Sequence, residues 1–131
     1  MDMAGALRAR LLAAPAVTAK VAQRVYWVDR PQTSALPAIT LQTVSELRPQ
    51  HMGGFDGLSD VRIQIDVWAA TYSDAKIIAE AVLAALIPAH TGNGIKFERS
   101  FIETMRDLGE RTETQFIHRT SIDLMVHYST V

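Results

Sequence analysis

The chain has 131 residues, a length that suits one domain and leaves too little core for two. Hydrophobic residues make up 48% of it and charged residues 21%, which indicates a folded globular chain and excludes a disordered one. The formal net charge of -1 argues against a general coat for nucleic acid or anionic membrane, and the lack of cysteine excludes disulfides and thiol chemistry.

The first part of the chain predicts two helices followed by two strands. Ala, Leu and Arg dominate residues 3–14 and predict a helix that ends at Pro15, after which residues 16–22 form a short second helix. Residues 25–28 are rich in β-branched and aromatic side chains and predict a strand. A second strand is expected at residues 38–44, after a turn that contains proline.

The middle of the chain predicts a loop, a half-buried strand and an amphipathic helix. Residues 47–59 hold one proline and three glycines with few apolar anchors, so we expect a long, mobile hairpin loop outside the core. Residues 60–68 alternate apolar and polar side chains, as a strand with one buried face does. Ser73 is the predicted N-cap of a helix that carries an apolar stripe to Ile87 and ends at Pro88.

The last third of the chain predicts a β-hairpin. Residues 95–105 form one strand, and residues 107–114 form a charged connection around Gly109. From Phe116 a period-two pattern predicts a final strand with one buried face. The expected fold is α+β, with an antiparallel sheet of about four to five strands and two main helices packed on one face, in a single domain over residues 1–131.

No motif in the sequence supports catalysis. The four histidines have no partner at the spacing of a metal site, and the glycine pairs match no phosphate-binding loop. The serines and threonines lack a nucleophile elbow. We therefore predict that the protein is not an enzyme and that it has no catalytic residue, no metal site and no cofactor. The alternative from another class is a small enzyme or ligand-binding domain with Asp107, Glu110 and Glu113 in a cleft.

A set of segments spread over nearly the full length carries a likeness to a known family. They are residues 6–14, 24–27, 36–41, 57–69, 72, 74–86, 106–108 and 119–124. Together they resemble the small tail-completion, or tail-terminator, proteins of long-tailed bacteriophages, prophages and gene transfer agents. The likeness rests on diffuse patterns, so no catalytic residue is carried over from the family.

The resemblance implies an α+β protomer that forms a ring, typically a hexamer, at the head-proximal end of a phage tail tube. Such a ring would stop tube growth and join tail to head, with DNA passing through it without sequence-specific binding. Its partners would be further copies of the chain, the tail tube protein and a head–tail connector or adaptor protein. The protein would be made in the bacterial cytoplasm, reside in the virion tail and contact no membrane. A head-closure or adaptor protein on the head side is the alternative within this context.

Two predicted loops, at residues 47–59 and 107–114, are expected to join the protein to its partners, because scaffold strands leave contacts to surface loops. The candidate contact residues are Arg48, His51 and Phe55 in the first loop, with Arg106, Glu110 and Arg111 in or beside the second. An aromatic side chain at a glycine-rich tip, such as Phe55, is typical of a partner contact. An open strand edge is also expected to pair with a neighbouring copy.

Overall fold

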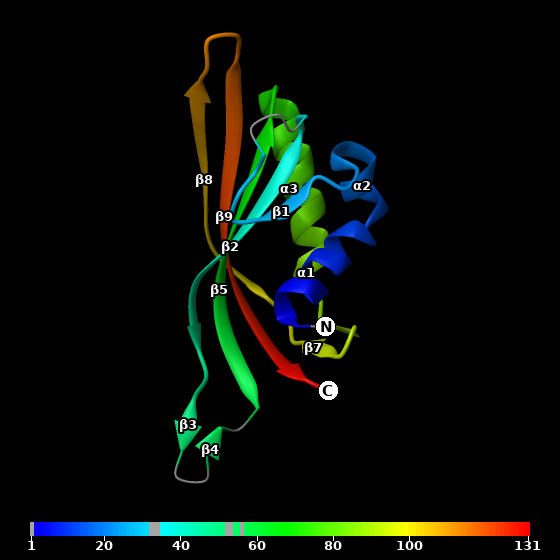
Figure 1. Cartoon of the computed structure of the whole chain (residues 1–131), viewed down its shortest axis with the longest axis vertical. Helices are drawn as coiled ribbons and strands as arrows, with labels where there is room; N and C mark the ends of the chain where they lie inside the picture. The colour runs from blue at the N-terminus through cyan, green and yellow to red at the C-terminus, as the bar shows by residue number, and fades with distance from the viewer. Residues whose placement is uncertain (1, 32–34, 52–53, 56) are drawn as a thin grey trace.

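The computed structural model describes residues 2–31, 35–51, 54–55 and 57–131, with backbone but no side chains at residues 51, 54 and 55. In this part of the chain the helices are α1 (Met3–Leu12), α2 (Pro15–Val21) and α3 (Tyr72–Leu86). The strands are β1 (Val25–Trp27), β2 (Ala38–Leu47), β3 (Gln50–His51), β4 (Gly54–Phe55), β5 (Leu58–Ala69), β6 (His90–Gly92), β7 (Ile95–Phe97), β8 (Phe101–Arg111) and β9 (Phe116–Thr130). Figure 1 shows the helices together on one side of a long, twisted sheet.

Seven of these strands form one sheet, in the order β1–β2–β5–β9–β7–β6, with β8 also paired to β9. Strand β5 pairs with one edge of β9 from Leu58↔Ser129 to Ala69↔His118. The other edge of β9 is therefore shared by β8 and β7 in succession. Strands β3 and β4 form a separate two-stranded ladder.

The predicted arrangement of a sheet with helices on one face is confirmed, but the predicted sheet itself is wrong in two respects. It has seven strands in place of four to five, and it is mixed, because β1 runs parallel to β2 with Val25 opposite Ile39. A third helix, the short α2, also packs with the two main ones. A short apolar run predicts a strand but not whether it runs parallel or antiparallel to the strand beside it. The sequence pattern therefore did not predict the parallel pairing of β1 with β2.

The helices cover the sheet face formed by alternate residues of β5 and β9. On β5, Ile63 and Ile65 are fully buried, and Ile63 lies opposite Leu124 of β9. The facing helix layer is supplied by Leu7, Leu11, Ile78, Val82 and Leu86. Each such side chain stabilises the fold by roughly 1.5–3 kcal/mol relative to an exposed position. The predicted buried face of these two strands is confirmed.

Polar side chains mark where two of the helices begin. Asp2 Oδ1 accepts a hydrogen bond of 2.9 Å from the backbone N–H of Gly5 at the start of α1. At α3, Thr71 Oγ1 accepts one of 3.1 Å from the N–H of Asp74. The prediction of Ser73 as N-cap is wrong, because that residue already lies in the first turn. Thr71 and Ser73 both have a hydroxyl and both precede the apolar stripe of α3. Thr71 is the cap because its backbone is extended, whereas Ser73 is already helical.

The single strand predicted over residues 95–105 is also wrong, because the chain forms two strands there. Between β7 and β8, the N–H of Ser100 donates a hydrogen bond of 2.9 Å to the carbonyl of Ile87, which follows α3. This bond takes the backbone out of the ladder with β9. Strand β8 then continues to Arg111, through most of the charged connection predicted at residues 107–114.

Candidate assembly interface

The β8–β9 hairpin projects beyond the helices at one end of the molecule (Figure 1). Every residue of β8 is exposed, although the strand pairs with β9 from Phe101↔Met125 to Arg111↔Phe116. The second edge of β8 carries no strand within the described part of the chain. Such an edge presents unpaired N–H and C=O groups to a partner strand.

Strand β8 also exposes large apolar side chains. They are Phe101, Ile102, Met105 and Leu108, with exposed fractions of 54%, 44%, 38% and 40%. Ile102 pairs with Leu124 and stands on the helix side of the sheet, whereas Leu108 pairs with Arg119 on the other face. These apolar side chains lie on both faces of one strand with an open edge, a position from which a partner strand or its side chains can contact them. Sequence reasoning missed this group because it assigned Phe101, Ile102 and Met105 to one predicted strand and Leu108 to a charged connection.

The Phe116 ring packs closely over the backbone of Gly109 at the hairpin end, so a larger residue at position 109 would have to displace this ring. A Cβ atom at Gly109 would lie 2.5 Å from Cζ of Phe116, closer than real contacts allow. The Phe116 ring in turn packs edge-on against His118, with the ring centroids 4.9 Å apart. Gly109, which was predicted to lie in a charged connection, therefore lies inside strand β8, where the Phe116 ring covers its backbone.

The structure places Arg106, Glu110 and Arg111 together on β8, so the prediction that they occupy a loop is wrong. Nη1 of Arg106 lies 3.8 Å from Oδ2 of Asp123 on β9. The Arg111 guanidinium lies over the Phe116 ring at 5.5 Å, and Glu110 lines a hollow on the hairpin. All three candidates are exposed, and their contact with a partner stays a prediction.

Asp107 attaches the hairpin to helix α3. Its carboxylate accepts hydrogen bonds from Nζ of Lys76 and from Oη of Tyr72. The hydrogen bond from the Lys76 ammonium lowers the pKa of Asp107 below its usual value and raises that of Lys76. An exposed carboxylate whose pKa is lowered is poorly suited to take up a proton at neutral pH, which weighs against the alternative of Asp107 as an acid–base group.

The other three candidates lie toward the opposite end of the sheet. Nε of Arg48 is 2.7 Å from Oε2 of Glu46, and the same oxygen accepts a hydrogen bond of 2.9 Å from Oη of Tyr128. The hydrogen bond to Glu46 raises the pKa of Arg48 above its usual value. His51 and Phe55 lie on β3 and β4, but their side chains are outside the described part of the structure.

The predicted loop at residues 47–59 is therefore corrected to a two-stranded ladder that extends the β2–β5 hairpin, with Gln50 opposite Phe55. In Figure 1 this ladder and the β8–β9 hairpin project from opposite ends of the molecule. The structure thus brings the six candidates together in two groups of three and keeps the groups apart.

The sheet face opposite the helices is polar and holds a network around Asp66. Asp66 is only 6% exposed, and its carboxylate accepts hydrogen bonds of 3.1 Å from Nε of Arg119 and 3.0 Å from Nε2 of Gln64. The guanidinium groups of Arg119 and Arg30 lie over the Trp68 ring, at 5.0 and 5.1 Å from its centroid. The face is thus organised by charge-assisted hydrogen bonds and by cation–π contacts.

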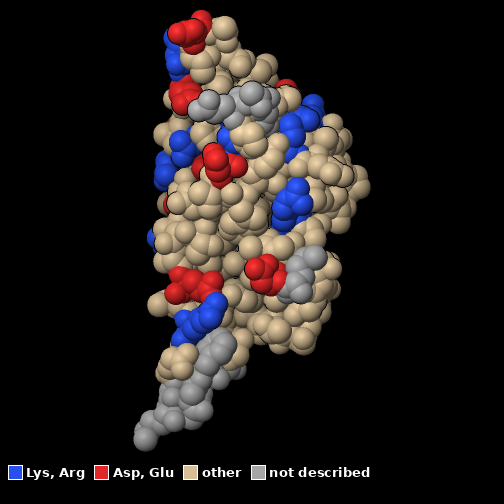
Figure 2. Space-filling view, viewed as in Figure 1, with Lys and Arg blue, Asp and Glu red and all other residues tan. Residues whose placement is uncertain are grey.

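Charges are mixed over the face that Figure 2 displays, where Lys and Arg alternate with Asp and Glu. Among the described residues, no three His, Asp or Glu side chains are grouped so as to hold a metal ion. None of the described helices has the length and apolar character to cross a membrane.

An open strand edge and projecting hairpins are features of a protein that assembles with other proteins. The chain belongs to the tail completion protein gp17 family, whose model matches residues 5–123. It is accordingly a tail completion protein, a structural component of the tail of a phage-like virion.

The structure is similar to a chain in the solved virion of a native gene transfer agent (GTA) particle. The TM-score is 0.68 at 20% sequence identity, and the match covers 97% of this chain and 94% of that one. A second solved chain matches at 12% identity over 99% of this chain and 97% of its own, with a TM-score of 0.47. A comparison with curated proteins finds no match.

Proposed function

We propose that the protein is a tail terminator. Copies of the chain close into a ring, typically a hexamer, at the head-proximal end of the tail tube, where the ring ends tube growth and joins the tail to the head connector or adaptor protein. DNA passes through this ring without sequence-specific contacts, and the protein catalyses no reaction. The observation that carries the proposal is strand β8, in which every residue is exposed, with its open edge and its apolar side chains.

A ring needs two different contact surfaces on each protomer, so that each copy binds the next head to tail. Strand β8 lies toward one side of the sheet and β1 forms the edge on the other side. A side-by-side contact therefore joins unlike surfaces, and such a contact gives a closed ring when the rotation between neighbouring copies divides a full turn. A net charge of -1 allows identical copies to pack without strong mutual repulsion.

The two projecting hairpins would then face different neighbours, because they point to opposite ends of the protomer (Figure 1). If the sheet stands along the tube axis, one hairpin reaches toward the tube and the other toward the connector. In this arrangement the groups of Arg48, His51 and Phe55 and of Arg106, Glu110 and Arg111 contact different proteins.

The proposal is tested with particles assembled around altered forms of the chain. The double variant Met105→Lys/Leu108→Lys places two charges on β8, which opposes strand pairing at that edge. We expect the double variant to fold but to give tails that are overlong or detached from heads. We expect the same defect in particles assembled without the protein. Ile77→Lys is the matched control, since Ile77 is 50% exposed on helix α3.

Normal, joined particles with the double variant would overturn the role of the β8 edge, and normal particles without the protein would overturn tail termination itself. Electron microscopy of labelled protein gives its position. Label at the head-proximal end of headless tails supports the terminator, whereas label on the portal vertex of tailless heads would identify a head-side adaptor instead.

A further inference from the structure

Arg10, near the end of α1, is held in a buried position by helix α3. The residue is only 8% exposed. Nη2 donates hydrogen bonds of 2.9 Å to the carbonyl of Ala85 and 2.8 Å to that of Pro88, at the end of α3. The guanidinium also lies over the Phe97 ring, 5.0 Å from its centroid. These contacts satisfy carbonyls that a helix end leaves free, and they fix the orientation of the cation.

The other terminal nitrogen of this guanidinium has no partner. Nη1 of Arg10 is shielded from solvent and makes no hydrogen bond within the described part of the structure. Burial lowers the pKa of Arg10, and no neighbouring carboxylate opposes that effect. A buried cation without a counter-charge is costly, because it has given up its hydration without an ion pair in return. The capping of α3 uses only Nη2 and leaves this cost unexplained.

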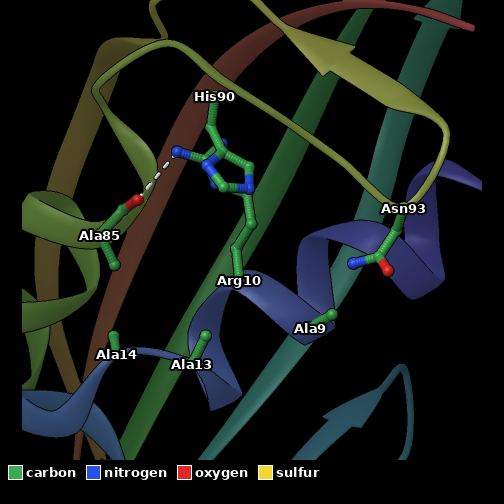
Figure 3. Close-up of a pocket in the computed structure, with 7 residues that line it drawn as sticks. All are labelled: Ala9, Arg10, Ala13, Ala14, Ala85, His90 and Asn93. Carbon is green, nitrogen blue, oxygen red and sulfur yellow. Dashed lines mark hydrogen bonds between the residues drawn. The ribbon is translucent and has the colours of Figure 1, made fainter. Parts of the chain in front are cut away.

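A pocket of about 240 Å³ opens beside Arg10. Its lining is Ala9, Arg10, Ala13, Ala14, Ala85, His90 and Asn93. Figure 3 shows that Ala9 of α1 and the two alanines that follow this helix, Ala13 and Ala14, line one side of the pocket, and that His90 and Asn93 reach in from the β6–β7 hairpin opposite. The small alanine side chains leave the space open. Asn93 has a φ of 54°, a left-handed conformation that asparagine tolerates better than most residues.

We infer that this pocket binds a carboxylate carried by a partner polypeptide, an Asp or Glu side chain that enters between α1 and the β6–β7 hairpin. Nη1 of Arg10 donates to one carboxylate oxygen, the Asn93 amide donates to the carboxylate, and the alanine methyls pack against the methylene groups. Access to the shielded Nη1 requires neighbouring side chains to move, and the exposed His90 lines the same pocket. A singly charged carboxylate matches the single uncompensated cation, whereas a phosphate dianion would need further donors.

The first test is NMR of the full-length protein titrated with acetate, with an acetylated and amidated Ala-Glu-Ala peptide, and with the Ala-Gln-Ala peptide as its neutral match. We expect the Arg10 Nε–Hε and Asn93 side-chain amide signals to shift with acetate and the Glu peptide, with a Kd on the order of 1–10 mM for one charge-assisted contact. The Gln peptide should leave them unmoved. No shift with acetate would overturn the site, and tighter binding of inorganic phosphate would overturn the carboxylate assignment.

Two variants and one control localise the binding. Arg10→Gln should abolish the shift of the Asn93 amide, and Asn93→Gly should weaken acetate binding about tenfold. Asn93→Gly keeps the positive φ, so it preserves the fold if Arg10→Gln does not. Arg8→Gln is the control, because the Arg8 guanidinium lies on the same helix but donates to the carbonyls of Val25 and Gln23. Acetate binding that survives Asn93→Gly and Arg10→Gln unchanged would refute the pocket.

A second experiment identifies the source of the carboxylate. If a partner polypeptide supplies it, particles assembled with Asn93→Gly should incorporate less of the variant than of the Arg8→Gln control. Equal incorporation, in the presence of acetate binding to the wild-type pocket, would mean that the site takes a free carboxylate and would overturn the partner assignment. The peptide titration needs no ring and no tail, so its result is independent of the terminator role.

Discussion

Removal of Arg119 should destabilise the protein through the carboxylate that it leaves behind. The Asp66 side chain is 9% exposed and the Arg119 side chain 28% exposed, and their atoms Oδ1 and Nε are 3.1 Å apart. Breaking a fully buried pair costs about 3–5 kcal/mol, because the remaining charge has neither water nor a partner. Gln64 still donates to Asp66, and Arg119 is partly solvated, so we expect Arg119→Leu to lower the free energy of unfolding by about 2–4 kcal/mol.

Urea unfolding followed by circular dichroism measures this loss. Arg62→Leu is the matched control, since Arg62 pairs with Glu103 on the same sheet face with both side chains about 40% exposed, and such pairs contribute less than about 1 kcal/mol. The double variant Asp66→Asn/Arg119→Leu removes the stranded charge and should regain most of the loss. The reasoning is refuted if Arg119→Leu costs no more than Arg62→Leu, or if the double variant is less stable than Arg119→Leu alone.

Three further predictions concern the core and two titrating groups. Leu124→Ala, at a fully buried position of β9, should cost about 3–5 kcal/mol, whereas Met125→Ala on the opposite face should cost under about 1.5 kcal/mol; equal losses in urea unfolding would contradict the assigned faces. Burial, followed by the hydrogen bond to a glutamate, raises the pKa of Tyr128. The neutral hydroxyl of Tyr128 is thus favoured in the native state, so its contribution to stability is complete below a pH of about 10 and is lost as pH rises through the native pKa. Tyr128→Phe should unfold less steeply with alkali than the wild type, and identical pH profiles would count against the burial of this hydroxyl. Since the ammonium of Lys76 lowers the pKa of Asp107, that pair stabilises the fold above the ordinary aspartate pKa and ceases to do so as pH falls through the lowered one. In Lys76→Met the carboxyl carbon of Asp107 should titrate at a higher pH by NMR, and an unchanged midpoint would mean that the two groups do not pair in solution.

Sequence patterning predicted best where one physical requirement controls a whole element. Ile63, Ile65 and Val67 alternate with polar residues because one face of β5 packs on helices, and the structure buries all three. Proline cannot continue the backbone hydrogen bonds of a helix, so Pro88 predicted that α3 ends at Ile87. The observed last residue is Leu86, one residue earlier. These signals are local and depend on neighbours close in sequence.

Patterning failed where pairing between distant segments overrides local chemistry. Arg106 and Arg111 have the composition of a charged connection, yet they belong to a strand because β9 pairs with them across the hairpin. The segment predicted to form a contact loop is therefore a strand, and its contact with a partner stays a prediction. The apolar residues Phe101 and Leu108 were read as parts of two different elements, which hid their common exposure on β8.

The sequence by itself determined the main helices and the buried faces of the long strands, because these depend on periodic patterns along the chain, and its resemblance to tail-completion proteins indicated the family. Only the tertiary structure decided that β1 runs parallel to β2, that β8 is open along one edge, and that Arg10 is buried beside a pocket without a counter-charge. Those features arise from contacts such as that between Arg10 and Pro88, which are 78 residues apart, and no local preference encodes such a contact.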